Sequence, residues 1–470
     1  MFKILSATNY RSFKDLEIEL APITLFVGPN NSGKSSIVSI LRLLSQTADS
    51  NDPNVRLLLN GPLGDFGTYK DLIHENEIRR NLDVSITVLN NRLHPQVASG
   101  KEIAFKLKYK YRSAIKEIIL KRIECFANNK HRVTAELNED SEKFLIRKIA
   151  DETISPSLNG SRIFRGFNIK NFLPRMLGAS YMNDDDRLGV LFAKEMLQVQ
   201  RDAFVTNKYL QSIEYVGAMR MPPSRTYLYT GERRRKVGAN GEHALSMLVM
   251  DSMRRGSKTK GILQHVIGWL SRAGIASDIK VVSLSDRYFE IHIQHPITKE
   301  YENFADVGYG NSQVIPILVA GLNCDSEDTL IVEEPEIHLH PKAQAELGDF
   351  FIELNNKGVQ SIVETHSEHM ILRLQKRIAE RVLNPKDIYI YYVNPTPNGK
   401  EIIRLEMDSK GMFKQDWPGG FFPERLNEAR DLAIARSTSN TVEKASPLDK
   451  FNVSVEKEKS VISRTRKILK

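Results

Sequence analysis

The eight residues Gly28-Pro29-Asn30-Asn31-Ser32-Gly33-Lys34-Ser35 constrain the fold of this 470-residue chain more than any other segment. They follow an apolar run, Ile23 to Val27, which predicts a strand that ends abruptly at glycine and proline. After them, apolar residues between Ile37 and Leu44 recur at the three- and four-residue spacing of a helix. A strand, a glycine loop and a helix in this order turn backbone N–H groups toward the positive end of the helix. That arrangement is a receptor for phosphate oxygens.

The residue types in this loop match the needs of a nucleoside triphosphate. Lys34 brings a positive charge for the β and γ phosphates, and the Ser35 hydroxyl can bind Mg²⁺. A glycine turn without a ligand is the alternative. The residues that we expect to contact the nucleotide are Gly28, Asn30, Asn31, Ser32, Gly33, Lys34, Ser35 and Ser36.

A second motif follows a short buried strand, Thr329 to Val332, and reads Glu333-Glu334-Pro335-Glu336. In an open α/β sheet, the carboxyl ends of the strands face the ligand crevice. Adjacent strand residues point to opposite faces, so the two acids have different roles. We expect Glu333 to serve the Mg²⁺ site and Glu334 to polarise the attacking water. An acidic surface turn is the alternative.

Two further motifs point to the same crevice. The strand Val359 to Val363 leads into Glu364-Thr365-His366-Ser367, where His366 can hydrogen-bond a γ phosphate. The stretch Asp306 to Gln313 opens an apolar helix, and we expect Gly310 and Ser312 to cap phosphates held by another subunit. An ordinary loop histidine and an ordinary glycine-rich helix start are the alternatives.

The pattern of apolar residues divides the chain into five segments. Strict alternation, as from Phe105 to Arg112, predicts an antiparallel sheet with one wet face. Helical spacing follows, and strands and helices then alternate, which predicts that a parallel sheet is resumed. The segments are the first part of an α/β core (1–81), a β-rich insertion (82–164), a mainly helical insertion (165–275), the second part of the core (276–436) and a basic flexible tail (437–470).

Together these motifs resemble the ABC-type ATPases of the SMC and OLD group, over roughly residues 1–75 and 300–425. The resemblance implies a P-loop NTPase core that is split in sequence, with ATP and Mg²⁺ as cofactors and ATP sites shared between two subunits. It makes His366 the switch histidine and Glu334 the catalytic glutamate. The chain departs from the group in having Glu333 where aspartate is usual, and Ser312 takes the place of the signature serine only by its position.

Two phrases carry a narrower resemblance, Glu333 to Pro341 and Trp417 to Phe422. They look like the stand-alone ATPases of bacterial anti-phage systems, such as the PtuA family of Septu, which act with an HNH nuclease. The resemblance implies an oligomeric ATPase whose nucleotide state regulates a separate nuclease. Two other hypotheses remain open. One is a nucleotide-gated scaffold with negligible turnover, and the other is a DNA repair ATPase or nuclease of the SMC and OLD type, for which we find no Toprim-like acidic cluster after His366.

The net charge of +9 favours polyanionic partners. Lys106, Lys108, Lys110 and Arg112 lie on one face of a predicted strand and would either track DNA phosphates or form a solvated face. The cluster Arg233 to Lys236 favours contact with DNA or a regulatory nucleotide. No apolar run approaches the roughly 20 residues that cross a membrane. Two distant cysteines and the absence of a leader pattern favour the cytoplasm.

Overall fold

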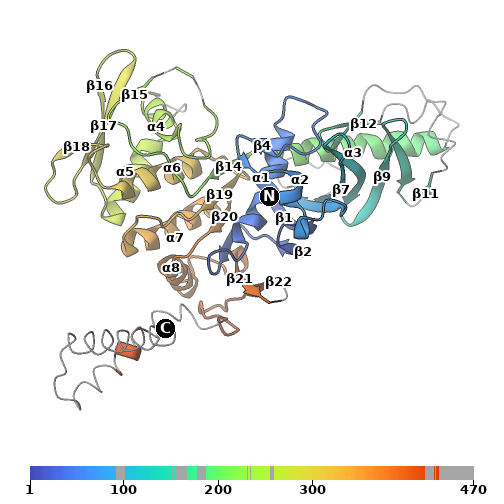
Figure 1. Ribbon diagram of the computed structural model, residues 1–470. Coiled ribbons are helices and arrows are strands. Elements are labelled where there is room, and N and C mark those ends of the chain that lie inside the picture. Colours follow the sequence, from blue (N-terminus) through green and yellow to red (C-terminus); the bar gives the residue numbers. More distant parts are fainter. Residues whose placement is uncertain are drawn as a thin grey trace, which may run out of the picture. The chain divides into compact units, whose positions relative to one another are not determined.

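The computed structural model describes residues 1–90, 101–150, 152–154, 167–176, 187–229, 231–232, 234–254, 259–397 and 399–418, and single residues between 428 and 434. By its internal contacts the chain forms two units, Met1–Gln415 and Asp416–Lys470. The strands and helices labelled in Figure 1 belong to the first unit. Arg233, the residues Gly419 to Phe422 and the tail 437–470 lie outside the described residues.

The core of the first unit is a six-stranded sheet in the order β14-β19-β20-β3-β21-β22. Its neighbours pair in parallel from β14 to β21, and β22 pairs with β21 antiparallel. The strands are β14 (Ile213–Val216), β19 (Thr329–Glu333), β20 (Gln360–Glu364), β3 (Ile23–Val27), β21 (Ile388–Thr396) and β22 (Gly399–Leu405). Every residue of β3 and β20 is buried, because helices cover both faces of a parallel sheet and apolar runs form its centre.

A second sheet is antiparallel and has eight strands in the order β11-β10-β9-β8-β7-β6-β1-β2. Its strands are β1 (Phe2–Tyr10), β2 (Phe13–Glu19), β6 (Leu82–Leu89), β7 (Glu102–Arg112), β8 (Glu117–Ala127), β9 (Lys130–Asn138), β10 (Lys143–Ile149) and β11 (Glu152–Thr153). The long helix α3 (Arg187–Gln211) packs against β9 and β10 (Figure 1). The predicted β insertion therefore extends a sheet that the first two strands of the chain begin.

The remaining helices flank the core sheet or a smaller sheet. Helix α1 (Lys34–Ala48) follows β3 directly, and α7 packs against α8. The other helices are α2 (Tyr69–Leu72), α4 (Ala244–Ser252), α5 (Ile262–Ala273), α6 (Tyr309–Asn323), α7 (Pro341–Asn356) and α8 (Glu368–Ala379). The small sheet contains β15 (Tyr227–Leu228), β16 (Asp278–Ser283), β17 (Tyr288–Gln294) and β18 (Tyr301–Asn303), and two hairpins pair β4 (Asn60–Gly61) with β5 (Gly64–Asp65) and β12 (Phe167–Lys170) with β13 (Leu173–Met176). No helix among the described residues is both long enough and apolar enough to span a bilayer.

The α/β class, the split core, the antiparallel sheet and the helical region all agree with the sequence-based expectation. One difference lies at β14, which pairs in parallel with β19 and so belongs to the core sheet, although it falls inside the predicted helical insertion. The sequence Ile213-Glu214-Tyr215-Val216 is too short to show a period, and it follows α3 after a single serine. A run of four such residues cannot be told from the end of a helix.

β14 carries a buried acid whose ionisation should limit stability at high pH. Glu214 is 4% exposed and accepts a hydrogen bond from the Val237 N–H over 2.7 Å. Burial raises its pKa from near 4.5 to about 8. The folded chain therefore keeps a proton that the unfolded chain releases, and the free energy of unfolding should fall as the pH rises from about 4.5 to about 8.

Glu214→Gln keeps the acceptor oxygen and cannot ionise. Between pH 4.5 and 8 its free energy of unfolding should therefore fall less than that of the wild type, and the difference should be on the order of a few kcal/mol. Urea unfolding at pH 5.5, 7 and 8.5 measures this difference. Glu17→Gln, which changes an exposed acid on β2, is the matched control. Parallel pH curves for the wild type and Glu214→Gln would contradict the prediction.

Candidate functional site

The glycine loop leaves β3 through backbone conformations that only glycine adopts without strain. Gly28 and Gly33 have φ values of 139° and 104°. A side chain at Gly28 would also bring its Cβ within 2.4 Å of the Val393 carbonyl oxygen on β21. The Lys34 Nζ lies beneath the loop and donates to the carbonyl oxygens of Gly28 and Pro29 over 3.0 and 2.9 Å. The loop thus surrounds a buried ammonium group. Burial lowers the pKa of this group.

Ser35 contacts an acid that the sequence analysis did not assign. Its Oγ donates to Glu364 Oε1 over 2.9 Å, and the same oxygen lies 3.9 Å from Lys34 Nζ. Glu364 ends β20, where its Cα partners are Glu333 on β19 and Phe26 on β3. Burial, and then repulsion by Glu333, raise the pKa of Glu364 to about 7. Glu364 therefore joins the glycine loop to the acidic strand end.

Glu333 is bound by an arginine from the helix of the glycine loop. Arg42 NH1 donates to Glu333 Oε1 over 2.7 Å, and the two side chains are only 13% and 14% exposed. The guanidinium lies 3.9 Å from the centre of the Tyr215 ring. Arg42 Nε and NH2 donate to the carbonyl oxygen of Leu63. A fixed positive charge thus already neutralises the acid that we expected to serve Mg²⁺.

Glu334 and His366 lie on the solvent side of this cluster. Glu334 Oε1 is 4.0 Å from His366 Nε2, and both side chains are about one-third exposed. Glu334 has a φ of 45°, because the chain turns sharply there at the end of β19. Burial, and then the Lys34 ammonium, lower the pKa of His366 and favour its neutral form. An acid and a neutral imidazole near the loop can orient a water and a phosphate oxygen.

Glu336 positions the histidine loop. Its carboxylate accepts from the Thr365 hydroxyl over 2.8 Å and from the His366 backbone N–H. Burial raises the pKa of Glu336. Glu336 therefore fixes the position of His366 by binding its backbone.

The strand end is held by an arginine that no sequence signal indicated. Arg220 NH2 donates to the carbonyl oxygens of Glu333 and Glu334 over 2.6 and 3.2 Å. The residue is 7% exposed, and burial lowers its pKa to about 10 despite the nearby acids. It stands four residues after β14, so the insertion that carries β14 also fixes the acidic motif.

The signature stretch, Asp306 to Gln313, spans the opening of α6. α6 begins at Tyr309 with Gly308 as its N-cap, and a Cβ on Gly310 would lie 3.1 Å from the His338 carbonyl oxygen. Ser312 is 4% exposed, in the first turn of the helix. That its hydroxyl contacts the phosphate of another subunit stays a prediction. The exposed N–H groups of the helix opening, near Gly308, remain suited to an anion.

The other predicted loop residues differ in exposure. Asn30, Asn31 and Ser35 are exposed, Ser36 is half-buried, and Ser32 is completely buried. The Asn31 backbone is left-handed, with φ 60°, and its carbonyl oxygen accepts from Lys400 Nζ over 2.7 Å. These assignments remain predictions, because the structure locates the residues without a nucleotide.

Polar atoms without partners surround the loop. Ser32 Oγ, Glu364 Oε2 and His366 Nε2 are buried and lack a hydrogen-bond partner. In the described part of the chain, no group of three or more His, Cys, Asp or Glu side chains could hold a metal by itself. Mg²⁺ typically binds through one or two carboxylates together with phosphate oxygens, so the oxygen set of Ser35, Glu364 and Glu333 fits Mg²⁺ delivered with a nucleotide.

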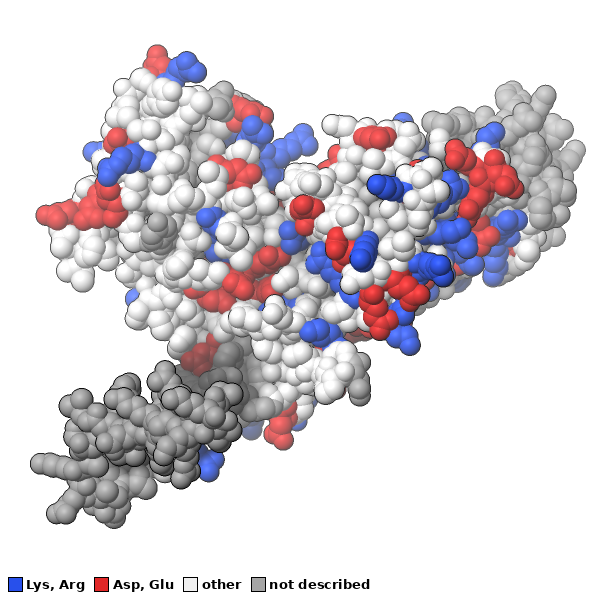
Figure 2. Space-filling model, viewed as in Figure 1, with Lys and Arg blue, Asp and Glu red and all other residues white. Residues whose placement is uncertain are grey.

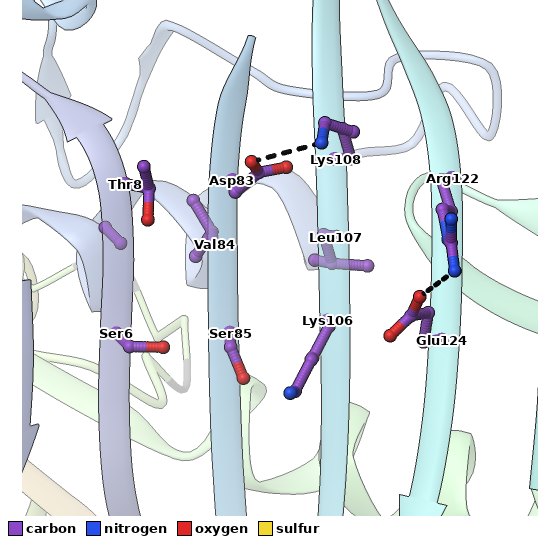
Figure 3. Close-up of a pocket in the computed structure, with 11 residues that line it drawn as sticks. Ser6, Thr8, Asp83, Val84, Ser85, Lys106, Leu107, Lys108, Arg122 and Glu124 are labelled. Atoms are coloured by element: carbon purple, nitrogen blue, oxygen red, sulfur yellow. Dashed lines mark ion pairs between the residues drawn. The ribbon is translucent and has the colours of Figure 1, made fainter. Parts of the chain in front are cut away.

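The basic row on β7 is paired with acids, which favours a solvated face over a DNA track. Lys108 lies 3.4 Å from Asp83, and Arg122 on β8 pairs with Glu124 (Figure 3). Lys106 lies 5.1 Å from the centre of the Phe126 ring. Lys110 and Arg112 pair with Glu139 and Glu142. Figure 2 shows basic and acidic side chains interleaved on this part of the surface.

A family model described as "AAA ATPase domain" matches residues 1–165 and 269–371, which is more than half of the chain. No curated protein matches.

Among solved structures, "Crystal structure of the SmcHead bound to the C-winged helix domain of ScpA" is 12% identical, with 87% of this chain and 98% of that chain covered and a TM-score of 0.46. An SMC head domain from Thermotoga maritima is 12% identical, with 86% and 99% covered and a TM-score of 0.39. An Smc head domain bound to the C-terminal domain of ScpA, from Pyrococcus furiosus, is 11% identical, with 86% and 96% covered and a TM-score of 0.42. On the strength of the family match, the chain belongs to the AAA ATPase domain family.

Proposed function

We propose that this protein is a Mg²⁺-dependent ATPase whose nucleotide state controls a partner. The observation that carries the proposal is the convergence of distant segments at the glycine loop. Ser35 and Glu364 form a hydrogen bond although they are 329 positions apart in the sequence. Lys34, Glu334 and His366 complete a set of one cation, one partly exposed acid and one imidazole around the same loop.

Each side chain has a defined task in this proposal. The loop N–H groups and Lys34 bind the triphosphate, and Lys34 would exchange its bonds to Gly28 and Pro29 for phosphate oxygens. Ser35 and the neighbouring carboxylates would hold Mg²⁺, which supplies positive charge against the phosphates. Glu334 accepts a proton from the attacking water, and His366 orients a γ-phosphate oxygen.

We further propose that two or more copies form composite ATP sites. The opening of α6 supports this, because Gly308 is exposed and a Cβ there would meet nothing within 4 Å. The N–H groups at the start of this helix would cap the phosphates bound by another copy. The resemblance of the acidic motif to anti-phage ATPases suggests that the partner is a nuclease, of the HNH type in PtuA-like systems.

A nucleotide-gated scaffold with little turnover is the second candidate. The observation that favours it is the ion pair between Arg42 and Glu333, since an acid already neutralised by an arginine is a weaker ligand for Mg²⁺. In that case ATP would hold subunits together without being consumed.

Phosphate release by the full chain separates the two candidates. We expect Mg²⁺-dependent turnover that changes when an HNH partner protein is added, and light scattering should show a larger species with ATP than without nucleotide. Binding of ATP without phosphate release, with or without the partner, would instead support the scaffold. If the full chain binds no ATP, both candidates fail.

A further inference from the structure

Two carboxylates lie side by side at the centre of the core sheet, and their charges are balanced unequally. Glu333 and Glu364 are Cα partners in the parallel register of β19 and β20. Neighbouring residues in such a register point to the same face of the sheet, toward α1 in this case. Arg42 pairs with Glu333 over 2.7 Å, whereas the cation nearest to Glu364 is Lys34, at 3.9 Å.

Lys34 cannot satisfy Glu364 and a triphosphate alone. Its Nζ has three protons, and the two that serve the Gly28 and Pro29 carbonyl oxygens would pass to phosphate oxygens. When a triphosphate binds, several more negative charges approach this single ammonium. A buried carboxylate that loses its counter-ion is costly, so an additional cation is required beside Glu364.

The geometry leaves one oxygen of Glu364 available for that cation. Oε1 accepts the Ser35 hydroxyl over 2.9 Å, whereas Oε2 is buried without a partner, in a residue that is 4% exposed. The Ser35 hydroxyl is the group expected to hold Mg²⁺, so the free oxygen stands beside the metal position.

We propose that Glu364 is a ligand of the divalent cation that accompanies the nucleotide, together with Ser35, and that Glu333 is not the sole acid of the metal site. The inference rests on the proposed function, because it requires that the loop binds a nucleotide. It gives β20 two roles, since its last residue holds the cation and the loop that follows presents His366.

Binding of Mn²⁺ to the full chain tests the proposal without measuring turnover. The free Mn²⁺ signal in electron paramagnetic resonance is titrated with the wild type and with Glu364→Gln, in the presence of the non-hydrolysable analogue AMP-PNP. We expect the Mn²⁺ affinity of Glu364→Gln to fall at least about tenfold, as losses near metal ligands commonly do. AMP-PNP affinity in EDTA should be unchanged or slightly higher, because a negative charge near the phosphates has been removed.

The matched control is Glu214→Gln, which replaces an acidic side chain of the same 4% exposure in the same sheet, away from Ser35 and Lys34. It should keep the wild-type Mn²⁺ affinity. Glu364→Asp retains a carboxylate that is one methylene shorter, and it should bind Mn²⁺ more tightly than Glu364→Gln. Urea unfolding confirms that each variant is folded before its titration.

Glu333→Gln gives the comparison that decides between the two acids. A loss of Mn²⁺ affinity in Glu364→Gln, alone or together with a loss in Glu333→Gln, supports the proposal. A loss only in Glu333→Gln, or an Mn²⁺ affinity of Glu364→Gln and Glu364→Asp within twofold of the wild type, overturns it. Failure of the wild type to bind AMP-PNP, in EDTA or with Mn²⁺, would instead refute the proposed function.

Discussion

Lys34→Ala should abolish ATP binding at micromolar nucleotide concentrations. The ammonium lies directly beneath the loop, between the Gly28 and Pro29 carbonyl oxygens and the Glu364 carboxylate. Without it, the triphosphate would enter a buried site next to an unbalanced acid. Breaking a buried charge pair costs about 3–5 kcal/mol. At about 1.4 kcal/mol per tenfold change, the dissociation constant should rise roughly 100- to 4000-fold.

Isothermal titration of the full chain with ATP and Mg²⁺ measures this change. Lys14→Ala, which changes an exposed lysine on β2, is the matched control and should bind as the wild type does. Urea unfolding without nucleotide establishes that Lys34→Ala is folded. A folded variant with an ATP affinity within threefold of the wild type would show that the loop does not hold the triphosphate through Lys34.

Glu334→Gln should leave ATP binding unchanged and lower phosphate release by about 100- to 10,000-fold, the usual contribution of a general base. The substitution keeps the shape of the side chain and removes its ability to accept a proton. Arg42 pairs with Glu333 and not with Glu334. Glu334 Oε1 instead lies 4.0 Å from His366 Nε2. With hydrolysis blocked, the oligomer that forms with ATP should persist.

Single-turnover phosphate release and light scattering with ATP measure these two effects. Glu353→Gln, at an exposed acid on α7, is the control and should release phosphate at the wild-type rate. Turnover by Glu334→Gln within threefold of the wild type would refute the assignment of Glu334 as the base. Weakened ATP binding would indicate instead that Glu334 contributes to the cation or phosphate site.

The main features of the fold could be predicted because they depend on local patterns. The loop from Gly28 to Ser35 lies between a strand and a helix, and β19 and β20 end at the acids and at the histidine loop as expected. Each of these segments combines an apolar run with an abrupt polar or glycine end, which short-range sequence can show. The family match covers the same two parts of the chain.

The pairings within the site could not be predicted in the same way. Glu364 lies two residues before His366, the residue that the sequence analysis assigned in this segment. Its place beside Glu333 and Ser35 follows only from the register of β20 with β19 and β3. Strand order is a long-range property, so no local pattern identifies which acid meets Ser35. Arg42 is seven residues after Ser35 and so on the same face of α1, which the helical period does indicate. Its partner, 291 positions away, is not indicated.

Arg220 and Ser312 illustrate two other limits. Arg220 belongs to a stretch rich in proline and arginine, where one buried arginine among several exposed ones has no distinguishing signal. Ser312 was assigned as the signature serine by its position, and it lies buried in the first turn of α6, where its contact with a phosphate stays a prediction. The residue at which a helix begins depends on a difference of one or two positions, which spacing alone does not resolve.

Arg220 binds main-chain carbonyl oxygens at positions 333 and 334, and every amino acid carries such an oxygen. The path of the backbone at this strand end is therefore insensitive to the identity of the two side chains. Exchanging either acid for its amide changes the reactive group while its attachment point stays in place. For the same reason, new chemistry could arise at these two positions by single substitutions, without any loss of the supporting architecture.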